Sequence, residues 1–375
     1  MRRCIVAGEA VLKIDPSWMR PLWRGGPLVS AVGFGGYRVD DRVPEHREAL
    51  RAALAAGFNL VDTSTNYGDG HSETLVGEET AEGPGGPVVV TKAGYVQGSN
   101  QEEALRRIRE GRPWEGMVEY ARDCWHCISP GFLSDQLTSS LARLARRRVD
   151  VLLLHNPEYF LSDARQRRAP QDEAREAFYA RVEQAFRRLD EEVLAGRIGA
   201  YGVSSNTLVV PKGRPDAVDL SRLLGIAGPG FRVVQLPANP LELGARDEPH
   251  TEGDRSVLEV AREAGLGVLV NRPFNAFAPG GLVRFAPVDW RSPAFAGVPP
   301  AEVARLEAVE GDRQEQLGLH LDEVFGPGPG TTLSRRTLLA LLELPGVTAV
   351  LAGMRRAAYV EDVAAALAEG GERGA

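Results

Sequence analysis

Four titratable side chains stand at or just beyond the ends of short apolar runs. Asp62 follows the run FNLV, and Tyr67 comes five residues later in the segment VDTSTNYGDGHSE. Lys92 ends the run VVVT, and His155 ends the run VDVLLL. A carboxylate, an ammonium, a phenol and an imidazole brought to one place could exchange protons with a substrate. Taken singly, three of them have structural alternatives: Asp62 as a turn cap, Tyr67 as a packing residue and His155 as a hydrogen-bonded core histidine.

Lysine is rare in this sequence. Only three of the 44 basic residues are lysines, namely Lys13, Lys92 and Lys212. Because arginine supplies positive charge almost everywhere else, a lysine at the end of a buried strand indicates a role for a compact ammonium that a planar guanidinium would fill poorly.

Eight apolar runs rich in β-branched residues could position these side chains. Amphipathic helix patterns that end near Gly or Pro separate most of the runs. Apolar strands that alternate with helices predict a parallel sheet buried on both faces. Eight such units favour a closed (β/α)8 TIM barrel over an open doubly wound sheet, which is the structural alternative. The runs cover residues 28–36, 58–65, 87–94, 149–157, 197–206, 232–240, 266–274 and 346–354.

The chain is longer than a bare barrel, which needs about 250 residues. We expect one domain over residues 1–375, with insertions at about 95–134, 158–172 and 275–331. Each insertion follows a strand and precedes a helix. We therefore expect long βα loops over the C-terminal mouth of the barrel, where barrel enzymes hold their chemistry. Residues 4–14 are expected to form a small hairpin that closes the opposite end.

Composition and charge argue against several classes of protein. With a hydrophobic content of 43% and a charged content of 25%, the chain is too apolar to be disordered. The formal net charge of -7 is spread along the chain, which argues against a nucleic-acid partner. With no signal-peptide pattern and no uncharged segment of about 18 residues, we expect a cytoplasmic protein without a membrane partner. Cys124 and Cys127 form a single CxxC, for which we expect a structural or incidental role and no metal site.

Motifs along the barrel resemble those of the aldo-keto reductases, a family of NAD(P)-dependent (β/α)8 oxidoreductases. In chain order they are VGFGGYRV, DTSTNYGDGHSE, VVVTK, LLHNPE, YGVSSN, VQLPANP and VLAGMRRAAYVEDV. The resemblance implies a catalytic set of Asp62, Tyr67, Lys92 and His155. The spacing from Asp62 to Tyr67 matches the family, whereas the interval from Lys92 to His155 is lengthened by the insertion that contains CWHC.

This resemblance implies a role for each catalytic side chain. Hydride transfer from nicotinamide to a carbonyl carbon places negative charge on the carbonyl oxygen, and Tyr67 would donate a proton there. Lys92 is expected to lower the pKa of Tyr67 by favouring the phenolate, and Asp62 to hold the Lys92 ammonium in place. His155 would hydrogen-bond the substrate oxygen and orient it toward Tyr67. In alcohol oxidation, Tyr67 would act as the base.

The resemblance also implies positions for a nicotinamide cofactor. Ser205, Asn206 and Gln235 match the residues that hold the nicotinamide carboxamide in this family. Gly36 and Tyr37 match the loop beside the nicotinamide ribose. The other expected cofactor positions are Asp62, Asn271, Arg272, Pro273, Gly353, Arg355, Arg356, Tyr359 and Asp362.

Two arginines near the C-terminus bear on the choice of cofactor. Gly353 ends the last strand, and Arg355 and Arg356 follow it at the start of a helix. Backbone amides at a helix N-terminus and guanidinium groups both suit phosphate oxygens. We therefore expect NADP, with NAD as the alternative cofactor.

Two positions depart from the family pattern. The stretch 271–273 provides no aromatic ring where the family often has a tyrosine that stacks on nicotinamide. Asp362 and Val363 stand where the family has a Glu-Asn pair that contacts adenine. Neither departure involves the residues expected to move protons.

The leading interpretation is an NADP-dependent oxidoreductase that reduces the carbonyl of an aldehyde, ketone or sugar, or oxidises a small-molecule alcohol. A Schiff base on Lys92 would instead make the protein an aldolase-type lyase. A cofactor-binding regulatory protein with little turnover is the third interpretation. The sequence indicates neither the substrate nor the oligomeric state.

Overall fold

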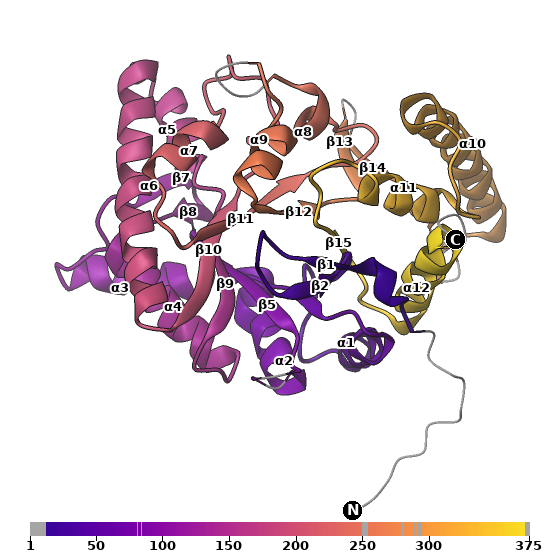
Figure 1. The fold of residues 1–375 in the computed structure, drawn as a ribbon, viewed down its shortest axis with the longest axis horizontal. Coiled ribbons are helices and arrows are strands. Elements are labelled where there is room, and N and C mark those ends of the chain that lie inside the picture. Colours follow the sequence, from indigo (N-terminus) through magenta and orange to yellow (C-terminus); the bar gives the residue numbers. More distant parts are fainter. Residues whose placement is uncertain are drawn as a thin grey trace, which may run out of the picture.

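A closed barrel of eight parallel strands with helices outside it forms the body of the protein (Figure 1). The computed structural model describes residues 13–80, 82–83, 85–249, 254–278, 281–288, 290 and 295–371. The predicted (β/α)8 TIM barrel is confirmed, and each of the eight predicted apolar runs overlaps one barrel strand. The order around the barrel is β10-β11-β12-β15-β3-β4-β5-β9, and it closes between β9 and β10. These strands are β3 (Val32–Gly35), β4 (Leu60–Asp62), β5 (Val88–Ala93), β9 (Val149–His155), β10 (Ile198–Ser204), β11 (Phe231–Pro237), β12 (Gly267–Asn271) and β15 (Ala349–Ala352).

The barrel helices begin and end at the signals that the sequence carries. In the first of them, Pro44 occupies the first turn and Gly57 caps the end in the left-handed conformation. Another starts with a capping box between Ser256 and Glu259 and ends at the left-handed Gly265. The barrel helices are α1 (Pro44–Ala56), α2 (His71–Glu79), α4 (Pro130–Arg143), α6 (Gln171–Leu194), α7 (Leu220–Ile226), α9 (Val257–Ala264), α11 (Leu333–Leu342) and α12 (Ala357–Gly371).

Side chains alternate between the inside and the outside of the barrel along each strand. On β5, Val88 and Val90 belong to the apolar cluster inside the barrel, and Lys92 continues their alternation. On β9, Val151 and Leu153 lead in the same way to His155. The same alternation applies to three other strands. Asp62, Gln235 and Asn271 each follow an inward residue by two positions, namely Leu60, Val233 and Leu269. Polar groups from five strands therefore gather at the C-terminal end of the barrel.

A short antiparallel hairpin packs at the other end of the barrel. It consists of β1 (Met19–Pro21) and β2 (Leu28–Ser30), preceded by the 3-10 turn η1 (Pro16–Trp18). Leu22 and Val29 from this hairpin join the apolar cluster inside the barrel. The hairpin expected over residues 4–14 lies outside the described residues, apart from residues 13 and 14.

The segments expected to be insertions form small elements of their own. The first contains β6 (Tyr95–Val96), α3 (Ser99–Arg109), β7 (Val118–Ala121) and β8 (Cys124–His126), whose strands form the sheet β6-β8-β7. The second contains α5 (Tyr159–Gln166). The third contains the antiparallel pair β13 (Asn275–Ala278) and β14 (Gly281–Arg284), followed by α10 (Pro300–Phe325). The remaining short helices are η2 (Tyr67–Gly70) and α8 (Gly244–Asp247).

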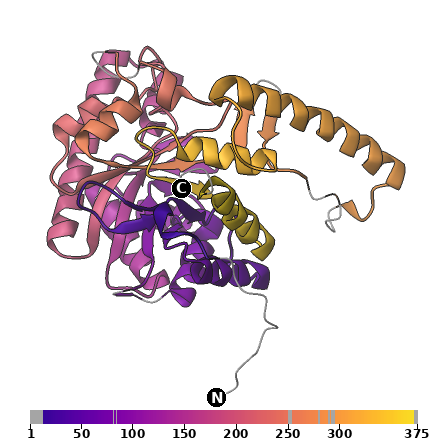
Figure 2. The same cartoon turned by 45° about the vertical axis from the view of Figure 1, so that its right-hand side comes forward.

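The long helix α10 extends away from the barrel body (Figure 2). Leu317 from its second half packs with Ala276 and Phe285 in a small apolar cluster that is separate from the two clusters of the barrel. Among the described residues, no helix combines the length and the apolar character needed to span a membrane.

Candidate active site

Asp62, Tyr67 and Lys92 meet at the C-terminal end of the barrel. The Nζ of Lys92 lies 2.7 Å from Oδ2 of Asp62 and 3.2 Å from the phenolic oxygen of Tyr67. The register explains the first contact, because Asp62 pairs with Val90, two residues before Lys92 on the neighbouring strand. Tyr67 reaches the same point from η2, directly after the loop that leaves β4. The five-residue spacing seen in the sequence thus spans this loop.

The ammonium of Lys92 uses all three of its hydrogens within the protein. It donates to Asp62, to Tyr67 and to the backbone carbonyl of Thr63, the last at 2.8 Å. Its Nζ also lies 4.6 Å from the centre of the Tyr67 ring. The side chain is fully buried. Lys92 is therefore held as a fixed positive charge beside the phenol.

Burial acts on both members of this ion pair. It raises the pKa of Asp62, and the charge of Lys92 and the hydrogen bond from Gln235 oppose this rise. It lowers the pKa of Lys92, and the charge of Asp62 opposes this fall. Each partner therefore helps to keep the other ionised inside the barrel.

The expected lowering of the Tyr67 pKa is wrong. Burial raises the pKa of Tyr67 well above its usual value, and the negative charge of Asp62 and the neighbouring Tyr37 add to the rise. Removing the phenol from water penalises the phenolate, and Asp62 offsets the positive charge of Lys92. Tyr67 therefore retains its proton at neutral pH, which suits a proton donor.

His155 lies beside Tyr67 without contacting it through a hydrogen bond. Their ring centres are 6.1 Å apart, and the rings are nearly perpendicular. The Nδ1 of His155 lies 3.1 Å from the hydroxyl of Ser64. Burial lowers the pKa of His155 well below its usual value, and the charge of Lys92 acts in the same direction. The imidazole is therefore neutral at pH 7.

Gln235 connects Asp62 to the neighbouring strands β10 and β12. Its Nε2 donates to Oδ1 of Asp62 at 2.7 Å, and its Oε1 accepts from Ser204 at 3.1 Å and from Asn271 at 3.4 Å. The Oδ1 of Asn271 is buried and has no hydrogen-bond partner in the described part of the chain. A buried acceptor without a partner is suited to receive an N–H from a ligand. The sequence analysis missed Ser204, which the alternation along β10 could have identified.

Gly36 and Tyr37 follow β3 at the edge of this site. The amide of Gly36 donates to the carbonyl of Asp62 at 2.8 Å. A Cβ at this position would lie 2.6 Å from that carbonyl oxygen and 2.7 Å from the hydroxyl of Ser72, so the close approach requires glycine. The Tyr37 ring is 63% exposed and stands 5.4 Å from the Tyr67 ring. It therefore offers an aromatic surface next to the Tyr67 phenol.

The backbone of Asn206 is held by a buried acid that the sequence analysis missed, whereas the hydroxyl of Ser205 accepts from the amide of Thr207 at 3.1 Å. The Oε1 of Glu158 accepts from the backbone amide of Asn206 at 2.9 Å. The other oxygen, Oε2, is buried and has no partner among the residues described. Burial raises the pKa of Glu158 to about 7. Glu158 could have been identified from the sequence, because it lies three residues after His155, which ends a buried strand.

The other predicted cofactor residues lie directly after β12 or near the start of α12. Arg272 pairs with Glu242 at 3.1 Å, and Pro273 is buried beside it. The Oδ1 of Asp362 accepts from Arg335 at 2.7 Å, so this oxygen is already engaged. Gly353, Arg355, Arg356 and Tyr359 lie between the end of β15 and the first turn of α12, and of these Gly353, Arg355 and Tyr359 are exposed.

Aromatic side chains from the first two insertions cover His155. The Tyr95 ring lies 4.7 Å from the His155 ring and 5.4 Å from the Tyr159 ring. Tyr120 continues this group with its ring 4.9 Å from Tyr159. The hydroxyl of Tyr95 also accepts a hydrogen bond from Nδ2 of Asn156 at 2.7 Å. The backbone of Asn156 is in the left-handed conformation. These tyrosines form one wall beside the imidazole.

The CxxC motif lies within the same insertion. Both thiols are free, and burial raises the pKa of each. Cys127 contacts the hydroxyl of Ser129 at 3.3 Å. The raised pKa values disfavour reactive thiolates.

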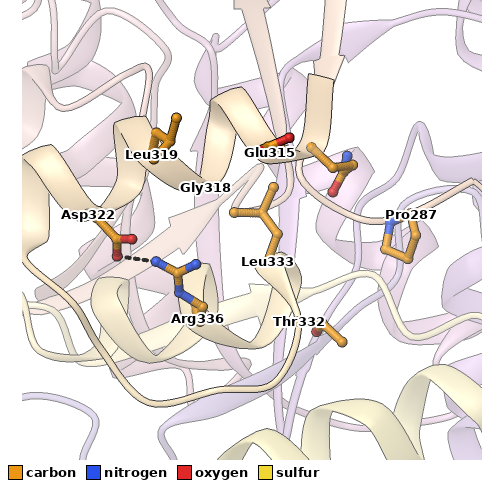
Figure 3. A pocket seen from close by; sticks show the side chains of 9 residues that line it. Pro287, Glu315, Gly318, Leu319, Asp322, Thr332, Leu333 and Arg336 are labelled. Carbon is orange, nitrogen blue, oxygen red and sulfur yellow. Dashed lines mark hydrogen bonds and ion pairs between the residues drawn. The ribbon is translucent and has the colours of Figure 1, made fainter. Parts of the chain in front are cut away.

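A groove of about 490 Å³ lies between α10 and α11 (Figure 3). Leu319, Leu333 and the paired Asp322 and Arg336 line it. None of the predicted site residues belongs to this groove, so we assign the chemistry to the barrel mouth.

Comparison with curated proteins finds related reductases. Aflatoxin B1 aldehyde reductase member 2 of Rattus norvegicus is 28% identical over 137 residues, which cover 36% of this chain and 31% of the relative. An uncharacterised oxidoreductase of Schizosaccharomyces pombe is 28% identical over 151 residues, which cover 38% of this chain and 42% of the relative. The aligned regions thus span less than half the length of these curated relatives.

Solved structures share the fold at low sequence identity. The aldo-keto reductase of Bacillus halodurans in its holo form has a TM-score of 0.59 at 16% identity, covering 93% of this chain and 90% of that one. The aldo-keto reductase of Klebsiella pneumoniae in complex with NADPH has a TM-score of 0.52 at 16% identity, covering 95% and 90%. The model of the Aldo/keto reductase family matches residues 31–276, from the residue before β3 into β13. This chain therefore belongs to the aldo/keto reductase family.

Proposed function

We propose that this protein is an NADP-dependent oxidoreductase that transfers a hydride between nicotinamide and the carbonyl of an aldehyde, ketone or sugar. The observation that carries the proposal is the buried contact of Lys92 with both Asp62 and the Tyr67 hydroxyl. Family membership supports the reaction class. The curated relatives named as aflatoxin B1 aldehyde reductases support a carbonyl substrate.

The side chains divide the work of proton transfer. Tyr67 donates its hydroxyl proton to the substrate oxygen as negative charge develops there. Its raised pKa keeps it protonated until that point. Lys92 stabilises the phenolate that the transfer leaves, since its Nζ lies 3.2 Å from that oxygen. Asp62 keeps the ammonium charged and oriented.

The residues at the mouth fit a nicotinamide cofactor, which supplies the hydride when bound. Asn271 holds a buried acceptor without a partner beside Gln235, and a carboxamide N–H would satisfy it. Arg355 and Arg356 at the start of α12 support a 2′-phosphate, hence NADP. The related structure from Klebsiella pneumoniae, solved in complex with NADPH, supports the same choice.

The arrangement of Lys92 disfavours a Schiff-base lyase. A nucleophilic amine needs a free lone pair, whereas this nitrogen donates three hydrogen bonds and pairs with Asp62. An amine that is also fully buried has no open approach for a carbonyl carbon.

Binding and turnover measured together test the proposed function. NADPH and NADH are titrated separately while tryptophan fluorescence is followed, and cofactor oxidation is then measured across aldehydes, ketones and sugars. The proposal expects tighter binding of NADPH and its oxidation by at least one carbonyl class. Borohydride trapping of a carbonyl on Lys92 without any nicotinamide would instead establish the lyase. Binding without turnover on every substrate would indicate a regulatory protein.

A further inference from the structure

The central strand of the first insertion carries a histidine that reaches the barrel. His126 lies on β8, between β6 and β7, and is the third residue of the CWHC motif. Its side chain is buried, with 1% exposed. The Nε2 of His126 lies 2.7 Å from the backbone carbonyl oxygen of His155, at the end of β9. The motif therefore contacts the strand that carries His155.

The direction of this hydrogen bond follows from its acceptor. A backbone carbonyl oxygen can only accept, so Nε2 of His126 must carry the hydrogen. Burial lowers the pKa of His126 to about 4, so the ring is neutral at pH 7 and has a single N–H. The contact is buried, so the carbonyl oxygen of His155 would lose its partner if this N–H were removed.

The same segment also contacts the neighbouring strand. β5 and β9 are paired up to Ala93 and Leu154, one residue before Gly94 and His155. The amide of Cys127 donates to the carbonyl oxygen of Gly94 at 2.8 Å, directly after β5. Two consecutive residues of the motif thus supply hydrogens to the two carbonyl groups at which the paired strands end.

Gly94 allows this close approach. A Cβ at this position would lie 2.5 Å from the carbonyl oxygen of His155 and 2.7 Å from Nε2 of His126. The two atoms that exclude a side chain are therefore the two atoms of the hydrogen bond. In a close-packed interior, an added methyl group would force the strand end and the imidazole apart.

We propose that His126 is a positioning residue for hydride transfer, because its N–H holds the end of β9 against the end of β5. Lys92 lies on β5 two residues before Gly94, and its Nζ is 3.2 Å from the hydroxyl of Tyr67. The ring of His155 on β9 lies 6.1 Å from the ring of Tyr67. The contact between the strand ends therefore sets the place of His155 relative to the phenol. Its effect on catalysis rests on the proposed function.

Two substitutions at His126 separate its N–H from the bulk of its ring. His126→Leu keeps an apolar group beside Tyr95 and Tyr159, whose ring centres lie 5.9 and 5.6 Å away, and removes the donor. His126→Gln offers an amide N–H at a similar reach. The measurement is stopped-flow single turnover of bound NADPH with the aldehyde that the unmodified protein reduces fastest. This rate constant counts only protein that holds NADPH, so a smaller folded fraction does not change it.

We expect the rate constant to fall roughly 10- to 100-fold in His126→Leu and to stay within about threefold of the unmodified protein in His126→Gln. Gly94→Ala disturbs the same contact from the other side and should resemble His126→Leu. An unchanged rate in His126→Leu, or equal losses in the two His126 variants, would overturn the proposal.

His320 provides the matched control. Its Nε2 lies 3.0 Å from the backbone carbonyl oxygen of Pro240, so it makes the same kind of contact from α10. His320→Leu should leave the single-turnover rate unchanged. NADPH affinity should also be unchanged in both His126 variants, because Gln235 and Asn271 lie on other strands. A loss of NADPH affinity that parallels the loss of rate would contradict a role in positioning His155.

Amide hydrogen exchange in the full chain tests the contact without cofactor. The amide of Asn156, one residue after His155, donates to the carbonyl oxygen of Ser204 at 2.7 Å. Loosening the end of β9 should make this amide exchange roughly tenfold faster in His126→Leu and leave it unchanged in His126→Gln. Equal exchange in the two variants would contradict the proposal. If no carbonyl oxidises NADPH while exchange is as expected, the proposed function fails and the contact between the strand ends stands.

Discussion

At the scale of single residues, the site depends on the ion pair of Asp62 and Lys92, and burial makes this pair important for stability. Lys92 and Asp62 would contribute little to stability at the surface, where such pairs are worth about 0–1 kcal/mol. Inside the barrel, each of them alone would be an uncompensated charge. The pair therefore links the stability of the barrel to its chemistry.

Replacing Lys92 by methionine tests this link. Lys92→Met leaves Asp62 without its partner, and we expect a loss of about 3–5 kcal/mol in the free energy of unfolding. The double variant Asp62→Asn, Lys92→Met removes both charges and should recover more than half of that loss. Denaturant unfolding measures the stabilities, and carbonyl reduction should be lost in both variants. A loss of unfolding free energy in the double variant that equals the sum of the two single-variant losses would show that the two charges do not interact.

Glu158 gives a second prediction at this scale, on the pH dependence of stability. Its pKa is raised to about 7 in the folded protein, so the folded state binds a proton more tightly than the unfolded state. The cost of ionising Glu158 is absent below its unfolded pKa, develops between about pH 4.5 and 7, and reaches about 3 kcal/mol above that window.

The variant Glu158→Gln cannot ionise. Its unfolding free energy relative to the unmodified protein should therefore rise across the same pH window, measured by denaturant titration at several pH values. A difference that stays constant with pH would contradict the raised pKa.

The sequence could identify Asp62, Tyr67, Lys92 and His155, because their strands and the motifs around them are visible in it. The direction of the Tyr67 pKa shift could not be predicted. A sequence shows that a lysine is near, but it does not show how far the phenol is removed from water. Nor does it show that the negative charge of Asp62 raises the pKa of Tyr67 further.

At the scale of elements, the loop after β3 sets the position of Asp62. The amide of Gly36 bonds the carbonyl of Asp62, and there is no space for a Cβ. Gly36→Ala should therefore displace β3 from β4 and destabilise the protein by about 1–3 kcal/mol. Carbonyl reduction should fall with it.

Gly225 provides the matched control for this prediction. It lies in α7, and a Cβ there would meet nothing within 4 Å. Gly225→Ala should leave activity unchanged and raise stability by up to about 1 kcal/mol. Equal effects of the two substitutions on thermal unfolding would show that space at Gly36 is not limiting.

The barrel strands were predictable because their apolar runs and helix stops are local features. The wall beside His155 was not. Tyr95, Tyr120 and Tyr159 come from two different insertions, and only the folded loops bring them together. Trp114, which also lies in the first insertion, packs on Phe132 and donates to Asp135.

At the scale of the whole molecule, the third insertion has a small apolar cluster of its own and also contacts the barrel helix α11 through the ion pair of Asp322 with Arg336. Its apolar cluster of Ala276, Phe285 and Leu317 is separate from the barrel clusters. The part of the chain matched by the family model ends at residue 276, where this addition begins. We propose that α10 can be perturbed without disturbing the catalytic group.

Two leucines of α10 test this independence. Leu317 is buried, whereas Leu319 is 58% exposed. Leu317→Ala should lower the stability of α10 by about 2–5 kcal/mol, and Leu319→Ala should stay within about 0.5 kcal/mol. Hydrogen exchange of peptides from α10 measures both effects. A loss of carbonyl reduction in Leu317→Ala would contradict the proposed independence.

The most direct test of the whole account is the hydride-transfer step with and without the Tyr67 hydroxyl. Tyr67→Phe keeps the ring beside Tyr37 and His155 and removes only the hydroxyl that we propose as proton donor. The measurement is single-turnover oxidation of bound NADPH by a carbonyl substrate in a stopped-flow instrument. We predict unchanged NADPH affinity and a rate about 10²–10⁴-fold lower than in the unmodified protein. An unchanged rate in Tyr67→Phe would contradict the assignment of Tyr67 as proton donor.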